Sequence, residues 1–409
     1  MRDPLETTKI NGRKVLFVTT VIVLLVTVWA VLQPQLVGTI VLILSLPTII
    51  ILHEAGHFVM AKRSGMKVTE FFVGFGPKIW SVRRGKPEYG VKAVLLGGYV
   101  RIIGMNNLEE VEPEDEPRAY RNQSFHDRIG VAVAGSAVHF MLALLLIFIL
   151  LVSIGLITDT TAVGTVGEGT AAEESGLEPD DVILSIDDVQ IETFDELRDY
   201  VRPRPEQELV VTVERDGEVI DIPVVPKRSD DEGEEVGLIG VTPALETDRV
   251  APVPAVRETF VVFGRTAQQS VEALGRLFSP AGIVNYVDTV FSGGEDSQGE
   301  QSQERFVSPL GFGRLANQAV ATGWLAVLGL LVSINVFVGI FNLIPLLPFD
   351  GGHVAIACYE KIASTIKGRP VQADVAKLLP ITSAVMVVLG FIFFSSLFLD
   401  ASNPLQNPF

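Results

Sequence analysis

The chain has 409 residues, a hydrophobic fraction of 48% and a formal net charge of −17. This length allows two or three domains, and the apolar content predicts several membrane spans. An acidic chain of this kind argues against nucleic acid as a partner, which requires clustered Lys and Arg. The single cysteine, Cys358, excludes an intrachain disulfide and a thiolate metal cage.

The N-terminal segment, residues 1–35, contains an apolar run from Val15 to Leu32. The run is too long for the apolar region of a signal peptide, so it predicts an extra, uncleaved transmembrane helix. Basic residues before the run place the N-terminus in the cytoplasm.

A second transmembrane helix is predicted over residues 36–64. It contains His53, Glu54 and His57 and ends at the basic pair Lys62-Arg63. Because Lys and Arg accumulate on the cytoplasmic side, the three ionisable residues belong to the cytoplasmic half of this helix.

Residues 65–105 contain β-prone segments punctuated by glycines, which predicts a β-hairpin region. Its basic residues place it on the cytoplasmic side. Residues 106–127 are acidic and without periodicity, so a loop is expected there, and a third transmembrane helix follows over 128–158.

Residues 159–228 alternate short strand and helix patterns, with a hairpin expected around Asp216-Gly217. They predict a small α+β domain, and its scarcity of Lys and Arg favours an extracytoplasmic position. Residues 229–322 predict an acidic linker followed by amphipathic helices that lie on the membrane surface.

The C-terminal part predicts a transmembrane helix over 323–352, a cytoplasmic loop over 353–377 and a last transmembrane helix over 378–400. The expected fold class is a polytopic α-helical membrane protein with about five transmembrane helices, a cytoplasmic-side β-hairpin region and an inserted extracytoplasmic α+β domain. The expected location is the cell membrane, with several passes.

The strongest chemical signal is the run His53-Glu54-Ala55-Gly56-His57. Helix positions i and i+4 share a face, so the two imidazoles can bind one zinc ion while Glu54 acts as general base toward water at the metal. Two histidines and one glutamate inside an apolar helix are unfavourable in hydrocarbon and indicate a function.

A hydrolytic zinc site has three protein ligands and one open position. Asp350 is the best candidate for the third ligand, because two prolines break the helix before it and two glycines after it allow close backbone approach. His353 is an alternative ligand. His139, inside the third span, is interpreted as a packing or pore-lining residue.

These motifs resemble the site-2 protease family of intramembrane zinc metalloproteases, in particular its bacterial and archaeal members with an inserted PDZ domain. The family's HExxH helix matches His53 to His57, and its Asn-x-x-Pro…Asp-Gly motif matches the run from Asn342 to Gly351. Residues 171–189 resemble a PDZ core. The resemblance covers the chain from about residue 37 onward.

The resemblance implies one zinc ion per chain, held by His53, His57 and Asp350, with Glu54 as the catalytic residue. It implies that transmembrane proteins are the substrates, cut by regulated intramembrane proteolysis. It also implies substrate-binding roles for the following residues: Asn342, Gly97, Gly98, Tyr99 and Val100.

The PDZ-like domain is then expected to bind an exposed peptide C-terminus or to gate substrate entry. One departure from the family pattern stands out. The third-span motif of the family reads Ala-Gly-Pro followed by Asn, whereas this chain has Ala134-Gly135-Ser136 and places His139 near the Asn position.

The same residues allow three other readings. In a metal transporter, the histidine pair would bind ions in transit and further acids would line the path. A catalytically silent, PDZ-bearing membrane scaffold would lack Glu54 or a ligand. An anchored soluble zincin would place the histidines on a water-exposed helix, but the residues flanking this motif are apolar.

Overall fold

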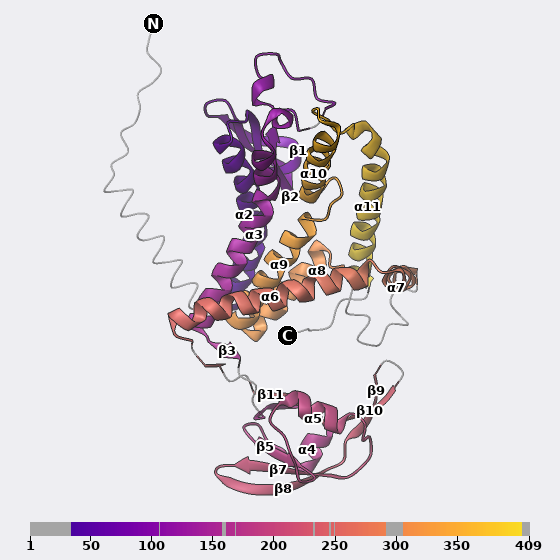
Figure 1. Cartoon of the computed structure of the whole chain (residues 1–409). Coiled ribbons are helices and arrows are strands. Elements are labelled where there is room, and N and C mark those ends of the chain that lie inside the picture. Colours follow the sequence, from indigo (N-terminus) through magenta and orange to yellow (C-terminus); the bar gives the residue numbers. More distant parts are fainter. Residues whose placement is uncertain are drawn as a thin grey trace, which may run out of the picture. The chain divides into compact units, whose positions relative to one another are not determined.

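The computed structural model describes residues 34–105, 107–157, 161–167, 169–231, 234–244, 247–248, 250–291 and 306–402. Figure 1 shows the chain. The predicted N-terminal transmembrane helix at Val15 to Leu32 lies outside the described residues.

Four helical segments within the described residues are long and apolar enough to cross a membrane. They lie at Leu44–Arg63, Phe125–Ser153, Trp324–Asn342 and Val375–Ser402. This number of apolar helices is compatible with a polytopic membrane protein, and the segments correspond to the second to fifth of the five predicted spans.

The chain divides into two compact units. The first unit contains the residues up to Phe140 and residues 309–388. Its helices are α2 (Pro34–Arg63), the first half of α3 (Phe125–Ser153), α8 (Pro309–Thr322), α9 (Trp324–Asn342) and α10 (Asp350–Lys367). Both α8 and α9 pack against α2 (Figure 1).

Strands β1 (Val68–Arg83) and β2 (Glu88–Ile102) form the predicted hairpin region of the first unit. Positive φ angles at Gly74 and Gly76 allow β1 to bend. Residues 70–73 therefore pair with residues 98–101 on one side and with residues 88–91 on the other. Within the described residues, the segment 98–101 has a strand partner on one side only, so its other edge is open to a further strand.

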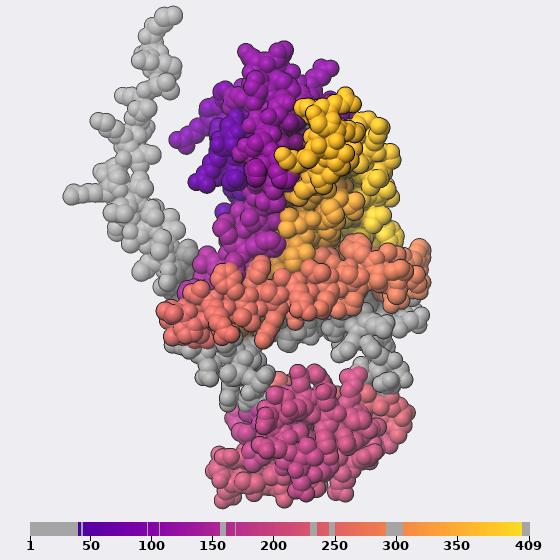
Figure 2. All heavy atoms as spheres, in the orientation of Figure 1, coloured from indigo at the N-terminus to yellow at the C-terminus, as the bar shows by residue number. Residues whose placement is uncertain are grey.

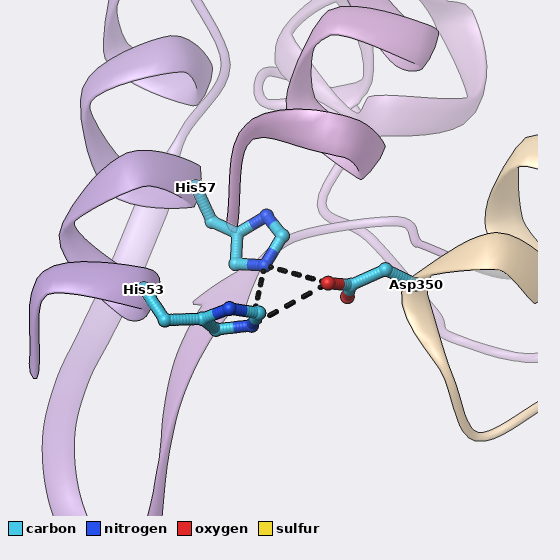
Figure 3. Close-up of side chains that lie close together, drawn as sticks. All are labelled: His53, His57 and Asp350. Carbon is cyan, nitrogen blue, oxygen red and sulfur yellow. Dashed lines mark hydrogen bonds and ion pairs between the residues drawn. The ribbon is translucent and has the colours of Figure 1, made fainter. Parts of the chain in front are cut away.

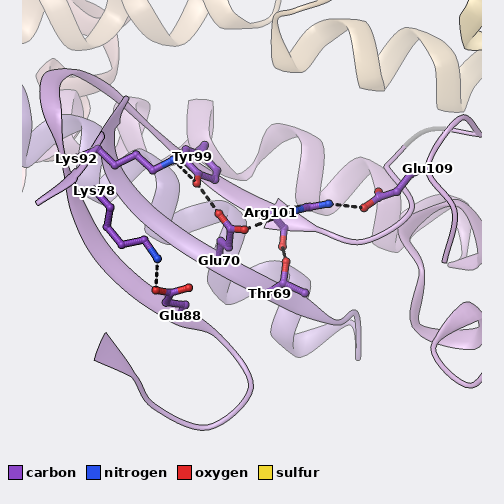
Figure 4. Close-up of polar contacts among 8 residues, drawn as sticks. All are labelled: Thr69, Glu70, Lys78, Glu88, Lys92, Tyr99, Arg101 and Glu109. Atoms are coloured by element: carbon purple, nitrogen blue, oxygen red, sulfur yellow. Dashed lines mark hydrogen bonds and ion pairs between the residues drawn. The ribbon is translucent and has the colours of Figure 1, made fainter. Parts of the chain in front are cut away.

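Polar contacts stiffen this hairpin (Figure 4). The Tyr99 hydroxyl donates to Glu70, and Lys92 Nζ donates to Tyr99 Oη at 2.8 Å. Arg101 bridges Glu70 and Glu109, with nitrogen–oxygen distances of 3.5 and 3.4 Å. The Lys92 ammonium also lies 4.7 Å from the centre of the Tyr99 ring, within the range of a cation–π contact.

The segment expected to be a loop over 106–127 contains two short 3₁₀ helices, η1 (Glu116–Arg118) and η2 (Tyr120–Asn122). They are fixed by polar pairs, including Lys67 with Asp115 and Arg121 with Glu116. The two 3₁₀ helices are held by ion pairs and not by regularly spaced apolar residues, so the hydropathy pattern of the sequence did not predict them.

The second unit contains residues 141–308 and 389–406. Its small domain has a four-stranded sheet in the order β6 (Val189–Gln190), β5 (Val182–Ile186), β7 (Leu209–Arg215) and β8 (Glu218–Val224). Two helices, α4 (Ala171–Ser175) and α5 (Phe194–Val201), each begin after a threonine whose hydroxyl accepts a backbone N–H. The predicted turn between β7 and β8 has Asp216 and Gly217 at positive φ.

Strand pairing continues beyond residue 228, where the small domain was expected to end and an acidic linker to begin. Strands β9 (Lys227–Asp231) and β10 (Glu234–Leu238) form a hairpin, and β11 (Val241–Pro243) pairs with β4 (Val163–Val166). An ion pair between Arg228 and Glu235 at 2.6 Å joins β9 to β10. Part of the segment predicted as a linker is therefore a strand pair that carries an ion pair across it.

Short strands β3 (Leu156–Ile157) and β12 (Thr247–Asp248) pair near the boundary of the small domain. Helices α6 (Pro252–Leu277) and α7 (Pro280–Phe291) follow and form a continuous band on the surface in Figure 2. Their exposed apolar residues include Val256 and Phe260, as expected for amphipathic helices. The hydroxyl of Tyr286 in α7 lies 2.8 Å from Ser395 Oγ in α11 (Leu379–Ser402).

The predicted loop over 353–377 is wrong for its first part. Helix α9 ends at Asn342, and α10 runs from Asp350 to Lys367, followed by the 3₁₀ helix η4 (Val375–Leu378). Asp350 therefore begins a helix and does not end the fourth span. Basic residues suggested a loop, but this segment forms a helix that buries the small residues Gly351, Gly352 and Ala357.

The buried carboxylate Asp181 makes the small domain sensitive to acid. Burial alone would raise its pKa, but hydrogen bonds from Arg215, with Arg215 Nε at 2.6 Å, and from the Glu178 amide hold the pKa below its usual range. Its stabilising contribution is therefore complete above the ordinary value of about 3.9 and is lost as the pH falls through the lowered pKa.

We expect Arg215→Met to destabilise the small domain by about 3–5 kcal/mol at neutral pH, because it leaves a buried carboxylate unpaired. When the pH is lowered, the free energy of unfolding of Arg215→Met should also fall less than that of the wild type. Hydrogen exchange of the β5 and β7 amides, corrected for intrinsic rates, measures both effects. The control is Arg198→Met, which removes an exposed ion pair. Equal protection in Arg215→Met and wild type would contradict the prediction.

Candidate metal centre and active site

Three predicted side chains converge in the first unit (Figure 3). Asp350 Oδ2 lies 3.4 Å from His53 Nε2 and 3.2 Å from His57 Nε2, and the two Nε2 atoms are 3.2 Å apart. Within the described residues, these three form one of two groups of histidine and acidic side chains close enough to hold a metal ion.

Local sequence explains how each of the three is positioned. His53 and His57 are one turn apart on α2, so their side chains project from the same face. Asp350 is delivered by the turn between α9 and α10, where prolines prevent the helix from continuing. A methyl group at Gly351 would lie 2.2 Å from the Leu343 carbonyl oxygen, so only glycine allows the first turn of α10 to pack this closely.

The hydrogen bonds around the three side chains call for a cation between them. His57 Nδ1 donates to the Val131 carbonyl oxygen at 2.7 Å, which leaves Nε2 without a proton. That nitrogen faces Asp350 Oδ2, which is buried and has no hydrogen-bond donor among the described residues. Two acceptors at 3.2 Å repel each other, and a bound cation removes the conflict.

The dimensions fit zinc. Two ligand atoms bound at zinc distances with tetrahedral angles lie about 3.3–3.4 Å apart. The three observed separations are 3.2, 3.2 and 3.4 Å. Two imidazoles and one carboxylate also match the donor sets of catalytic zinc sites, which keep the fourth position open.

Glu54 lies between the two histidines in sequence and faces β2. A methyl group at Gly98 would lie 3.0 Å from Glu54 Cγ, and the Val100 backbone amide is within hydrogen-bonding reach of the Glu54 carboxyl group. The open edge of the segment 98–101 is therefore next to the carboxylate.

An open groove with a volume of about 520 Å³ continues along the end of β2. It is lined by Tyr99, Val100, Arg101, Ile102, Met105, Leu108 and Glu109. The groove and the open strand edge together provide an extended surface beside Glu54.

Comparison with known proteins agrees with this geometry. The family model for Peptidase family M50 matches residues 41–390, which is most of the chain. This chain belongs to Peptidase family M50. The resemblance to site-2 proteases is confirmed, and the protein is a membrane zinc metalloprotease.

Relatives cover nearly the whole length of this M50 peptidase. Zinc metalloprotease Rip1 of Mycolicibacterium smegmatis is 33% identical over 408 residues, covering 90% of this chain and 98% of the relative. Rip1 of Mycobacterium tuberculosis strain H37Rv has the same identity and coverage over 410 residues. Metalloprotease MmpA of Caulobacter vibrioides is 29% identical over 395 residues, covering 88% of this chain and 96% of the relative. The zinc cofactor is thereby confirmed, and the transporter and scaffold readings are set aside.

The other candidate residues of this M50 peptidase lie outside the group of three. Asn342 is the partly buried last residue of α9. A methyl group at Gly97 would lie 2.4 Å from a ring atom of Phe75, so Gly97 faces the hairpin. The His353 ring packs edge-on against Tyr120, with ring centres 6.1 Å apart.

The second group of acidic residues, Glu112, Glu114 and Asp115, lies in the segment before η1. Asp115 is already paired with Lys67, and the two glutamates are exposed. Paired or exposed carboxylates of this kind are common without a bound ion, so no function is assigned to them.

Sequence reasoning did not predict the contacts that three residues make around the metal centre. The Val131 carbonyl orients His57, Gly135 passes directly beside the histidine pair, and Asn335 contacts His139. Every residue has a backbone carbonyl group, so residue types do not show which carbonyl accepts the hydrogen bond from His57. Asn335, however, is a polar residue inside an apolar span, which is a readable sign of function.

Replacing Gly135 with alanine is expected to impair zinc binding by this M50 peptidase. The added methyl group would lie 2.3 Å from His53 Cε1 and 2.5 Å from His57 Nε2, so the imidazoles must move. We expect zinc affinity to fall roughly 10- to 100-fold, as for other changes that misorient ligands. Zinc content after dialysis against a chelator gives the measurement.

Gly130→Ala is the matched control on the same helix. Its methyl group would meet only the flexible end of Met60, at 3.1 Å. Equal zinc content in the two variants would show that α3 does not restrict the site.

Proposed function

We propose that this protein is an intramembrane protease that hydrolyses peptide bonds in the transmembrane segments of other membrane proteins. His53, His57 and Asp350 hold one zinc ion, and Glu54 is the catalytic base. The observation that carries the proposal is a zinc-sized group of ligands beside a glutamate, with both histidines in an apolar helix and an open strand edge next to the glutamate.

A bound zinc ion supplies a Lewis acid that polarises the scissile carbonyl group and makes water more acidic. Glu54 takes a proton from the attacking water and later delivers it to the leaving amine. His57, anchored through Nδ1 on Val131, keeps its Nε2 lone pair directed at the metal position.

Substrate binding requires local unwinding, because a transmembrane helix hides its peptide groups in internal hydrogen bonds. The unwound segment adds as a strand to the open edge at residues 98–101, so that main-chain hydrogen bonds hold it in register beside Glu54. Gly98, Tyr99 and Val100 belong to this edge, Gly97 leads into it, and Asn342 contacts the bound segment.

The membrane orientation follows from charge. Lys62 and Arg63 end the helix that carries the histidines, which supports a metal centre near the cytoplasmic face of the cell membrane. The small α+β domain then lies outside the cytoplasm and acts as a PDZ-like module. It binds an exposed peptide C-terminus or restricts entry of bulky substrates.

The test is cleavage of a single-span substrate by the purified protein in liposomes. We expect cleavage that stops with a zinc chelator and returns with added zinc, and a cut mapped by mass spectrometry to the apolar segment. A cut confined to a water-exposed juxtamembrane loop would reject intramembrane cleavage while leaving a zinc protease in place.

A further inference from the structure

The two imidazoles of the metal centre are held in different ways. His57 donates through Nδ1 to the Val131 carbonyl oxygen at 2.7 Å. His53 Nδ1 is buried and makes no hydrogen bond within the described residues. The Gly135 carbonyl oxygen lies near His53 but does not reach hydrogen-bond geometry. Metal-binding histidines normally donate the second nitrogen to an orienting partner, so the orientation of His53 relies more on packing than that of His57.

Packing surrounds the His53 ring instead. The His57 ring stands edge-on to it, with ring centres 4.8 Å apart. The His139 ring lies 5.0 Å away at a tilt of 50°. Gly135 closes a further side, where a methyl group would lie 2.6 Å from His53 Nδ1. His139 is therefore a side chain from another helix whose ring packs against the His53 ring.

His139 is itself anchored across two helices. Asn335 Nδ2 in α9 donates to the Leu331 carbonyl oxygen at 2.8 Å, which leaves Asn335 Oδ1 as an acceptor. His139 Nδ1 lies 3.1 Å from that oxygen and donates to it. The two side chains are only 2% and 1% exposed, so this hydrogen bond satisfies two buried polar groups.

We propose that His139 and Asn335 form a positioning pair that sets the orientation of His53 for zinc binding. Asn335 fixes the His139 ring, and that ring fixes His53 by contact. His139 is not a ligand itself, since the group of atoms close enough to share an ion comprises only His53, His57 and Asp350. The inference rests on the proposed role of His53 as a zinc ligand.

The experiment uses the full chain in detergent, with three variants: His139→Ala, His139→Phe and Asn335→Leu. Three quantities are measured: the zinc dissociation constant by chelator competition, the visible absorption of the cobalt-substituted protein, and the melting temperature of the metal-free protein. Cobalt absorption reports ligand identity and geometry, which a purely structural residue elsewhere in the fold does not change.

We expect His139→Ala to raise the zinc dissociation constant by roughly 10- to 100-fold and to shift the cobalt bands. His139→Phe keeps a ring against His53 and should retain zinc affinity within a few fold of wild type. Asn335→Leu frees the His139 ring and should give an intermediate value. The control is Ile147→Ala, another buried residue farther along α3, which should lower the melting temperature without changing the cobalt bands.

Three results would overturn the positioning role. The first is that His139→Ala keeps wild-type zinc affinity and cobalt bands. The second is that Ile147→Ala loses as much zinc as His139→Ala, and the third is that the cobalt bands of His139→Ala show one nitrogen ligand fewer. His53→Ala separates this failure from failure of the proposed function. Wild-type zinc affinity in His53→Ala would reject the ligand set, whereas loss of zinc there and not in His139→Ala would reject the positioning pair alone.

Discussion

Glu54→Gln is expected to reduce peptide-bond cleavage by about 10²- to 10⁴-fold while zinc binding stays at the wild-type level. Glutamine has almost the same size and can still contact the Val100 amide, but it cannot accept a proton from water. The ligand atoms of His53, His57 and Asp350 are unchanged, so the metal centre remains intact.

The measurement is the initial rate of substrate cleavage in liposomes, with zinc content determined on the same preparation. Glu272→Gln removes the same charge from an exposed position on α6 and is the control. Full activity in Glu54→Gln would remove Glu54 as the general base. Loss of zinc in that variant would instead indicate that Glu54 supports the metal centre.

Asp350→Ala should release zinc and abolish cleavage. Only two imidazoles would remain at the site, fewer than the three protein ligands of known catalytic zinc sites. The loss of affinity should exceed the roughly 10- to 100-fold effect of removing an orienting partner. Added zinc at high concentration should restore little activity, because the geometry of the site is incomplete.

Zinc content and chelator competition measure this effect, and Asp199→Ala, at an exposed position on α5, is the control. Unchanged zinc affinity in Asp350→Ala would reject Asp350 as the third ligand. His353 would then be the remaining candidate for that ligand. The variants at Glu54 and Asp350 thus separate loss of the base from loss of the metal.

Much of the metal centre could be predicted from sequence because its parts are local or chemically distinctive. The spacing of His53 and His57 corresponds to one helical turn, so their convergence on one face of α2 follows from helix geometry alone. Asp350 was recognised from the prolines and glycines around it. Hydropathy predicted the four spans that lie within the described residues, since each is a long apolar run.

Other expectations failed where polar residues form ordered structure. The charged segment after residue 228 is a strand pair, and the basic segment after Asp350 is a helix. Charge and composition report solvent exposure, but they do not show which charged groups pair with each other.

Apolar runs, helical spacing and acid–base chemistry therefore determined that this chain is a membrane protein with a zinc-binding motif. Only the tertiary structure decided that Asp350 meets the histidine pair at zinc-like distances, that β2 leaves an open edge beside Glu54, and that His139 bonds to Asn335 and packs against His53. These contacts join residues up to about 300 positions apart. Local periodicity carries no information about such distances, because they depend on how separate helices pack.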